Sequence, residues 1–168
     1  AEIAGNKNRI QTQLGRVNDA GPQLVAAVKL AEDAFEEAIK QLQAALAKMN
    51  EQVQQRAADA AAANAPADKT QQDASVELSL QLNLANAHAR LAELRRMSAE
   101  SATLFDSARD IAAAAAMANM TFEKIDGPGR LAAATESAKA AIYSLTKALA
   151  VAKTVDQIIA PPAGQNGQ

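Results

Sequence analysis

A repeat of apolar residues at helical spacing runs through the stretch from residue 22 to residue 63. Its members follow one another at steps of three and four, which place them on one narrow stripe of an α-helix. Glu32 fills the one gap in this repeat. So narrow a stripe is typical of a coiled-coil seam, and a single helix in water cannot bury it. The chain must therefore supply partner helices or find them on other molecules. The seam consists of Val25, Val28, Phe35, Ile39, Leu42, Leu46, Met49 and Val53.

A shorter segment with helical spacing precedes this seam, from residue 2 to residue 18. We expect a break between the two helices at residues 19–22, because Gly21 suits the end of one helix and Pro22 the first turn of the next. The sequence leaves open whether the first helix packs within its own chain or against a neighbouring molecule. Its apolar residues are Ile3, Ile10, Leu14 and Val17.

The stretch from residue 76 to residue 84 is ambiguous between helix and strand. Its apolar residues alternate with polar ones, which is the pattern of a half-buried strand. Leucine favours a helix, however, and no second strand is offered to pair with this one. We therefore favour one helix over residues 73–118, with an apolar surface broad enough to contact two neighbours. The alternating residues are Val76, Leu78, Leu80, Leu82 and Leu84.

A last helix is expected over residues 130–160, between the turn signal at residues 126–129 and Pro161. The break before it carries Met120, Phe122 and Ile125, which we expect to fold over the end of the bundle. We expect this helix to lie along the others, with its apolar residues on one face. That face carries Leu131, Ala134, Ala138, Ile142, Leu145, Leu149, Ala152, Val155 and Ile159.

These patterns predict an all-α fold without a β-sheet: an elongated antiparallel helical hairpin, or a three- to four-helix bundle, with coiled-coil-like packing. The predicted helices cover residues 2–18, 22–63, 73–118 and 130–160 of a single domain that extends over residues 1–160. Residues 161–168 are predicted to form a polar C-terminal tail.

Composition argues against several functional classes. The net charge is −2, no basic block is present, and the chain has one Tyr and three Phe, so we expect no binding to nucleic acid. The absence of Cys removes disulfides and thiolate metal sites. No apolar run reaches the roughly 18 residues of a membrane-spanning helix. The N-terminus lacks the pattern of a cleavable signal peptide, which leaves the cytoplasm, a virion or export by a specialised machine as locations.

No group of residues predicts catalysis, a metal site or a cofactor. His88 is the only histidine, and the residues three and four positions after it are apolar rather than metal ligands. No catalytic residue, metal ligand, cofactor or small-molecule substrate is therefore expected.

A modest basic cluster lies midway along the third predicted helix. Arg90, Arg95 and Arg96 form it together with His88, and Glu93 and Glu100 lie within reach. We expect a solvated face with salt bridges. The alternative is a contact point for an acidic partner surface.

The sequence therefore favours a non-enzymatic structural protein that presents long amphipathic helices to copies of itself, as a homo-oligomer or polymer, or to another helical protein. Its composition, rich in Ala and without Cys or Trp, is similar to that of bacterial filament subunits, secretion-apparatus substrates and internal phage virion proteins. The alternatives are a secreted membrane-active protein, such as a translocator or pore-former, and a small helical adaptor or chaperone; membrane contact is the less favoured. The candidate interaction residues are Ile3, Ile10, Leu14, Val17, Val28, Phe35, Ile39, Leu42, Leu46, Met49, Val53, Leu78 and Leu82.

Overall fold

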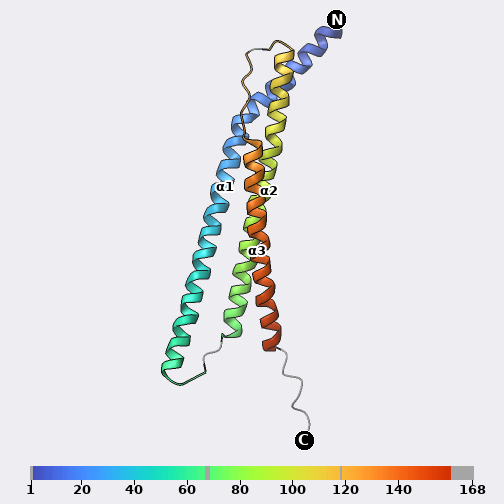
Figure 1. Ribbon diagram of the computed structural model, residues 1–168. Helices are drawn as coiled ribbons and strands as arrows, with labels where there is room; N and C mark the ends of the chain where they lie inside the picture. Colours follow the sequence, from blue (N-terminus) through green and yellow to red (C-terminus); the bar gives the residue numbers. More distant parts are fainter. Residues whose placement is uncertain (1, 67–68, 118, 160–168) are drawn as a thin grey trace, which may run out of the picture. The chain divides into compact units, whose positions relative to one another are not determined.

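The computed structural model describes residues 2–66, 69–117 and 119–159, and these residues form three α-helices and no strand (Figure 1). Helix α1 spans Glu2–Ala62, α2 spans Gln71–Ala114 and α3 spans Gly127–Ile159. The prediction of an all-helical chain is confirmed. Residues 76–84 lie inside α2, so this stretch is helix rather than strand. The predicted tail at residues 161–168 lies outside the described residues.

The chain divides into two compact units, to which all three helices contribute. Unit 1 comprises Ala1–Phe35 and Arg90–Ser137, and unit 2 comprises Glu36–Ala89 and Ala138–Gln168. The single domain over residues 1–160 stays a prediction.

The predicted break at residues 19–22 is wrong, because α1 continues through Pro22. A proline inside a helix removes a backbone hydrogen bond and costs about 3 kcal/mol, so tertiary packing must hold α1 together at this point. Gly21 allows that packing within unit 1. A Cβ atom at Gly21 would lie 2.9 Å from Cγ of Glu123 and 3.3 Å from Cε1 of Phe105. The predicted helices over residues 2–18 and 22–63 are therefore parts of one helix.

A hydrophobic cluster in unit 1 joins α1, the end of α2 and the segment that follows. Helix α2 ends at Ala114 instead of residue 118, because Ala116 adopts a left-handed conformation with φ 53°. The amide of Met117 then donates to the carbonyl of Ala112 over 2.9 Å, which satisfies a carbonyl at the helix end. The buried members are Leu14, Ala108, Ala112 and Phe122, with Val17, Met117 and Met120 packed against them.

Two hydrogen-bonded caps fix the starts of α2 and α3. In unit 2, the amide of Asp73 donates to Oγ1 of Thr70 over 3.1 Å, and the amide of Thr70 donates to Oδ2 of Asp73 over 3.0 Å. This reciprocal pair is a capping box, so α2 begins at Gln71 rather than residue 73. In unit 1, Oδ1 of Asp126 accepts from the amide of Gly129 over 3.0 Å. This cap starts α3 at Gly127 rather than residue 130.

Candidate interaction surfaces

The candidate interaction residues fall into three groups by exposure. The α1 seam lies mostly inside the two units, so most of it is already covered by the chain itself. Only the exposed group is open to another molecule, and its use in an interaction stays a prediction. Leu14, Val28, Ile39 and Met49 are buried; Val17, Phe35, Leu42, Leu46, Val53 and Leu78 are half-buried; Ile3, Ile10 and Leu82 are exposed.

Glu32, the charged residue of the seam, is the centre of an ion cluster in unit 1. Its side chain is 13% exposed, and it accepts hydrogen bonds from both neighbouring helices. Nε of Arg95 on α2 lies 3.2 Å from its Oε1, and Nη1 of Arg130 on α3 lies 2.6 Å from its Oε2. Arg95 also donates from Nη1 to Oγ of Ser137 over 2.8 Å. We call Glu32, Arg95, Arg130 and Ser137 the Glu32 cluster.

The expected basic face is divided by the structure. Arg95 belongs to the Glu32 cluster, so its placement on a solvated face is wrong. Arg96 does lie at the surface, where it bonds to Glu93 over 2.7 Å and to Glu100. The hydrogen bond from Arg96 lowers the pKa of Glu93, and it raises the pKa of Arg96 in return. The helical spacing indicates that Arg95 faces the interior, since it lies four residues after Leu91 and three before Ser98, both of which are buried.

Helix α3 packs through small residues, which corrects the predicted apolar face. In unit 2 the buried residues of α3 are Ala141, Ser144 and Ala148. Small side chains let helices approach closely, so they can form a packing face without large apolar groups. Ala134 of the predicted face is buried and Val155 is half-buried, but four of the large residues expected to pack are exposed instead. Leu131 in unit 1 and Ile142, Leu145 and Leu149 in unit 2 are each between 50% and 63% exposed.

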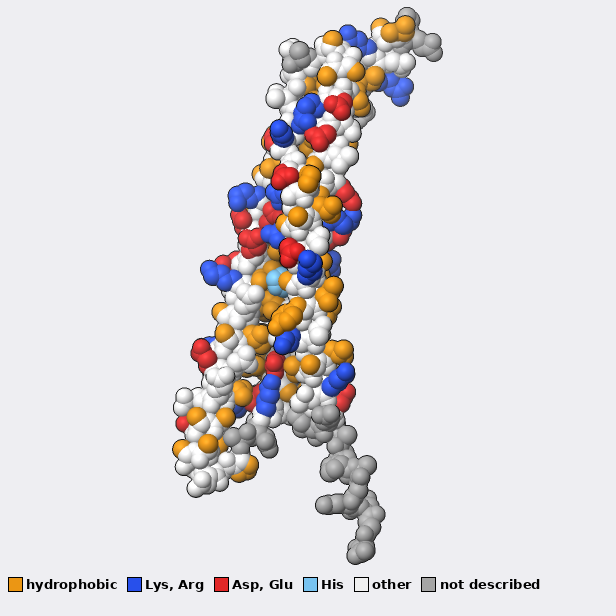
Figure 2. Space-filling model, in the orientation of Figure 1, with side chains coloured by type: hydrophobic (Ala, Val, Ile, Leu, Met, Phe, Trp, Pro, Cys, Tyr) orange, Lys and Arg blue, Asp and Glu red, His pale blue; other side chains and the backbone are white. Residues whose placement is uncertain are grey.

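We call Ile142, Leu145 and Leu149 the α3 stripe. Their steps of three and four keep them on one line of the helix surface. Lys139 and Lys153 lie one position after Ala138 and Ala152, which continue that line. Glu136 lies three residues before Lys139 and Asp156 three residues after Lys153, so charges of both signs accompany the stripe. Figure 2 shows hydrophobic side chains exposed among charged ones on the face that it draws.

A second apolar surface lies in unit 1, where α1 and α2 form a groove of about 510 Å³. Leu24 and Val28 line it from α1, and Leu94, Met97 and Leu104 line it from α2. Met97 and Leu104 are 53% and 57% exposed. We call it the Leu24 groove.

Two carboxylates border the Leu24 groove on α2. Glu93 and Glu100 lie four residues before Met97 and Leu104, respectively, and Glu100 also lines the groove. Arg96 bonds to both carboxylates, and Arg90 adds a second positive charge close to Glu93, so this edge carries charges of both signs. The groove thus combines an apolar floor with a charged edge.

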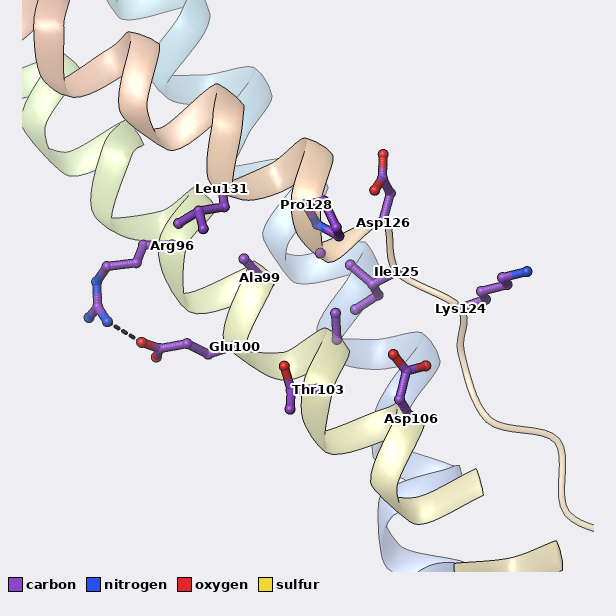
Figure 3. Close-up of a pocket in the computed structure, with 12 residues that line it drawn as sticks. Arg96, Ala99, Glu100, Thr103, Asp106, Lys124, Ile125, Asp126, Pro128 and Leu131 are labelled. Carbon is purple, nitrogen blue, oxygen red and sulfur yellow. Dashed lines mark hydrogen bonds and ion pairs between the residues drawn. The ribbon is translucent and has the colours of Figure 1, made fainter. Parts of the chain in front are cut away.

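A larger pocket of about 980 Å³ lies in unit 1 between α2, residues 124–126 and the start of α3 (Figure 3). Its carboxylates already have structural partners. Asp126 caps α3, Asp106 lies 2.6 Å from Nη1 of Arg109, and Glu100 pairs with Arg96. The three carboxylates of this pocket therefore take part in structural contacts.

Within the described ranges, no group of three or more His, Cys, Asp or Glu side chains is placed to hold a metal ion. Among those same residues, no helix combines the length and the apolarity that crossing a membrane requires.

No known protein family, no curated protein and no solved structure matches this chain.

Proposed function

We propose that this chain is a non-enzymatic structural protein that self-assembles by presenting helical surfaces to copies of itself. The observation that carries the proposal is the α3 stripe. Its three large aliphatic side chains are exposed at helical spacing, on a helix whose small-residue face is already buried. Scattered apolar residues are normal on a protein surface, but aliphatic residues repeated on one line of a helix favour a partner helix.

The proposal includes coiled-coil-like packing of the helices within each protomer, as a hairpin extended by a third helix. Burial along α1 supports this. Val28, Phe35, Ile39, Leu42, Leu46, Met49 and Val53 are all buried or half-buried, and Glu32 fills the remaining position. Such a seam buries the apolar residues of α1 inside the chain and leaves the α3 stripe exposed for association.

Replacing Leu145 with Glu tests this function. A charge in an apolar interface loses its hydration, so we expect Leu145→Glu to weaken self-association at least about tenfold. The matched control is Tyr143→Glu, since Tyr143 is 64% exposed on the same helix but lies off the stripe. Sedimentation velocity over a concentration series measures both variants against the wild type. Equal association of the two variants would contradict the proposal.

A small helical adaptor is the second candidate, and the Leu24 groove is the observation that favours it. An apolar groove between two helices suits the apolar face of a partner's amphipathic helix. A wild-type chain that stays monomeric at every concentration would favour this function over self-assembly.

A further inference from the structure

We propose that the first turns of α3, residues 127–137, open and close locally, and that the Glu32 cluster holds them closed. We call these residues the α3 start. They belong to unit 1, as do Glu32 and Arg95. The α3 stripe begins only at Ile142, so this opening is independent of self-assembly.

The α3 start buries little apolar surface. Its buried residues are Ala134 and Ser137, which are 6% and 5% exposed, and its one large apolar residue, Leu131, is 54% exposed. Helix α2, by contrast, buries Leu91 and Phe105 in the same unit. Helix packing is stabilised mainly by the burial of apolar area, and alanine contributes little of it.

The sequence of its first turn also disfavours a stable helix. Gly127 and Gly129 lie in this turn, and glycine is the poorest helix former after proline. Helical segments with few buried apolar contacts open at a lower free energy than the whole molecule unfolds. The α3 start therefore has the properties of a segment that opens locally.

Polar bonds supply the attachment that apolar packing does not. Nη1 of Arg130 lies 2.6 Å from Oε2 of Glu32 on α1, and Oγ of Ser137 accepts from Nη1 of Arg95 on α2 over 2.8 Å. The side chains of Arg130 and Glu32 are only 30% and 13% exposed, and hydrogen bonds between charged groups are the stronger ones. Both bonds lead to Glu32, since Arg95 also donates to it.

The α3 start is one wall of the pocket of about 980 Å³ (Figure 3). Gly127, Pro128 and Leu131 line the pocket from α3, while Ala99 and Ala102 line it from α2. The two helices approach closely here, because a Cβ atom at Gly127 would lie 3.1 Å from Cβ of Ala102. Opening removes this wall and uncovers Ala102, which is 4% exposed in the closed state. The Glu32 cluster thus controls access to the pocket.

A single cysteine reports the opening, because the chain has none of its own. Ala134→Cys places a thiol at a buried position of the α3 start, where N-ethylmaleimide, a neutral reagent, reaches it only after opening. Arg130→Met in this background removes the bond from α3 to Glu32 and keeps the bond between Glu32 and Arg95. We expect the labelling to become about tenfold faster, as the loss of one hydrogen bond between charged groups implies.

Two controls distinguish local opening from a general loss of stability. Ala108→Cys places the thiol at a buried position of α2 in unit 1, and its labelling should not respond to Arg130→Met. Arg96→Met removes an arginine that bonds to Glu93 and Glu100 on its own helix, and it should leave labelling at position 134 unchanged. Equal acceleration at positions 134 and 108, or none at position 134, would overturn the proposal.

Hydrogen exchange tests the same opening without a cysteine, in case a cysteine variant does not fold. Arg130→Met alone should accelerate the exchange of the amides at residues 130–137 by about tenfold and leave residues 71–89 of α2 unchanged. Equal acceleration in all three helices would mean that Arg130 stabilises the whole fold, and local opening would be wrong.

Salt should act on the same step, because the bond between Arg130 and Glu32 is ionic. Raising the salt concentration from about 0.05 M to about 1 M screens ion pairs and should accelerate labelling of the Ala134→Cys variant. The double variant with Arg130→Met has lost this bond, so its labelling should respond less. Equal salt dependence of the two proteins would show that the bond to Glu32 does not hold the α3 start closed.

Discussion

At the scale of single residues, the Glu32 cluster places a charge where the α1 seam is otherwise apolar. Removing a carboxylate from water is costly, and the two guanidinium groups and their hydrogen bonds offset that cost. Because Glu32, Arg95 and Arg130 come from three different helices, their bonds define which residues face each other in unit 1. A polar group in a seam is a known means of fixing helix register.

Glu32→Ala should destabilise the protein by about 2 kcal/mol, because it leaves two partly buried guanidinium groups without their carboxylate. Replacing all three charged residues with Leu or Met should recover most of this loss, since no ion then remains to be desolvated. Urea unfolding followed by circular dichroism measures both.

Glu37→Ala is the matched control for this prediction. Glu37 is exposed on the same helix and lies 4.0 Å from Lys40, so its removal should cost less than about 0.5 kcal/mol. Equal unfolding midpoints for Glu32→Ala and Glu37→Ala would mean that the Glu32 cluster does not stabilise the protein.

At the scale of the elements, the periodicity of the sequence correctly predicted which segments are helical. The predictions were wrong where tertiary packing determined a helix boundary or the buried face of a helix. The alternation at residues 76–84 was resolved correctly, because leucine and the lack of a pairing strand both favoured a helix. The prediction of a break at Pro22 was wrong because Gly21 packs against Phe105 and Glu123. No local sequence pattern reveals this packing.

The prediction of the packing face of α3 was wrong for a different reason. Periodicity selects large apolar residues as the packing face, yet α3 is buried through Ala141, Ser144 and Ala148. Small residues allow helices to approach closely. In an alanine-rich sequence, however, their positions only weakly indicate which face of a helix is buried. The α1 seam could therefore be predicted, whereas the exposed stripe and the partners of Glu32 required the structure.

The start of α2 should be sensitive to acid through Asp73. Hydrogen bonds from Arg56 and Thr70 lower the pKa of Asp73 from its usual 3.8 to about 2. A carboxylate with a lowered pKa contributes stability that is complete above its usual pKa and is lost as the pH falls toward the folded value. Its contribution should therefore disappear between about pH 4 and pH 2.

Asp73→Asn isolates this effect. We expect the variant to be less stable than the wild type at neutral pH, with the difference shrinking as the pH approaches 2. Thermal unfolding at several pH values compares the two proteins, and other carboxylates titrate alike in both. A difference in stability that stays constant down to pH 2 would contradict the role of Asp73 in the cap.

At the scale of the whole molecule, apolar residues fall into two groups, those covered within the units and those left exposed. The α1 seam and the small-residue face of α3 are covered within the units, while the α3 stripe and the Leu24 groove remain exposed.

The molar mass of the wild type by light scattering, across a dilution series from millimolar to micromolar, tests the central claim most directly. We expect a mass above 17.5 kDa that rises with concentration, because the exposed α3 stripe brings copies together. A mass of 17.5 kDa at every concentration would contradict self-assembly and would mean that the exposed stripe does not bring copies together.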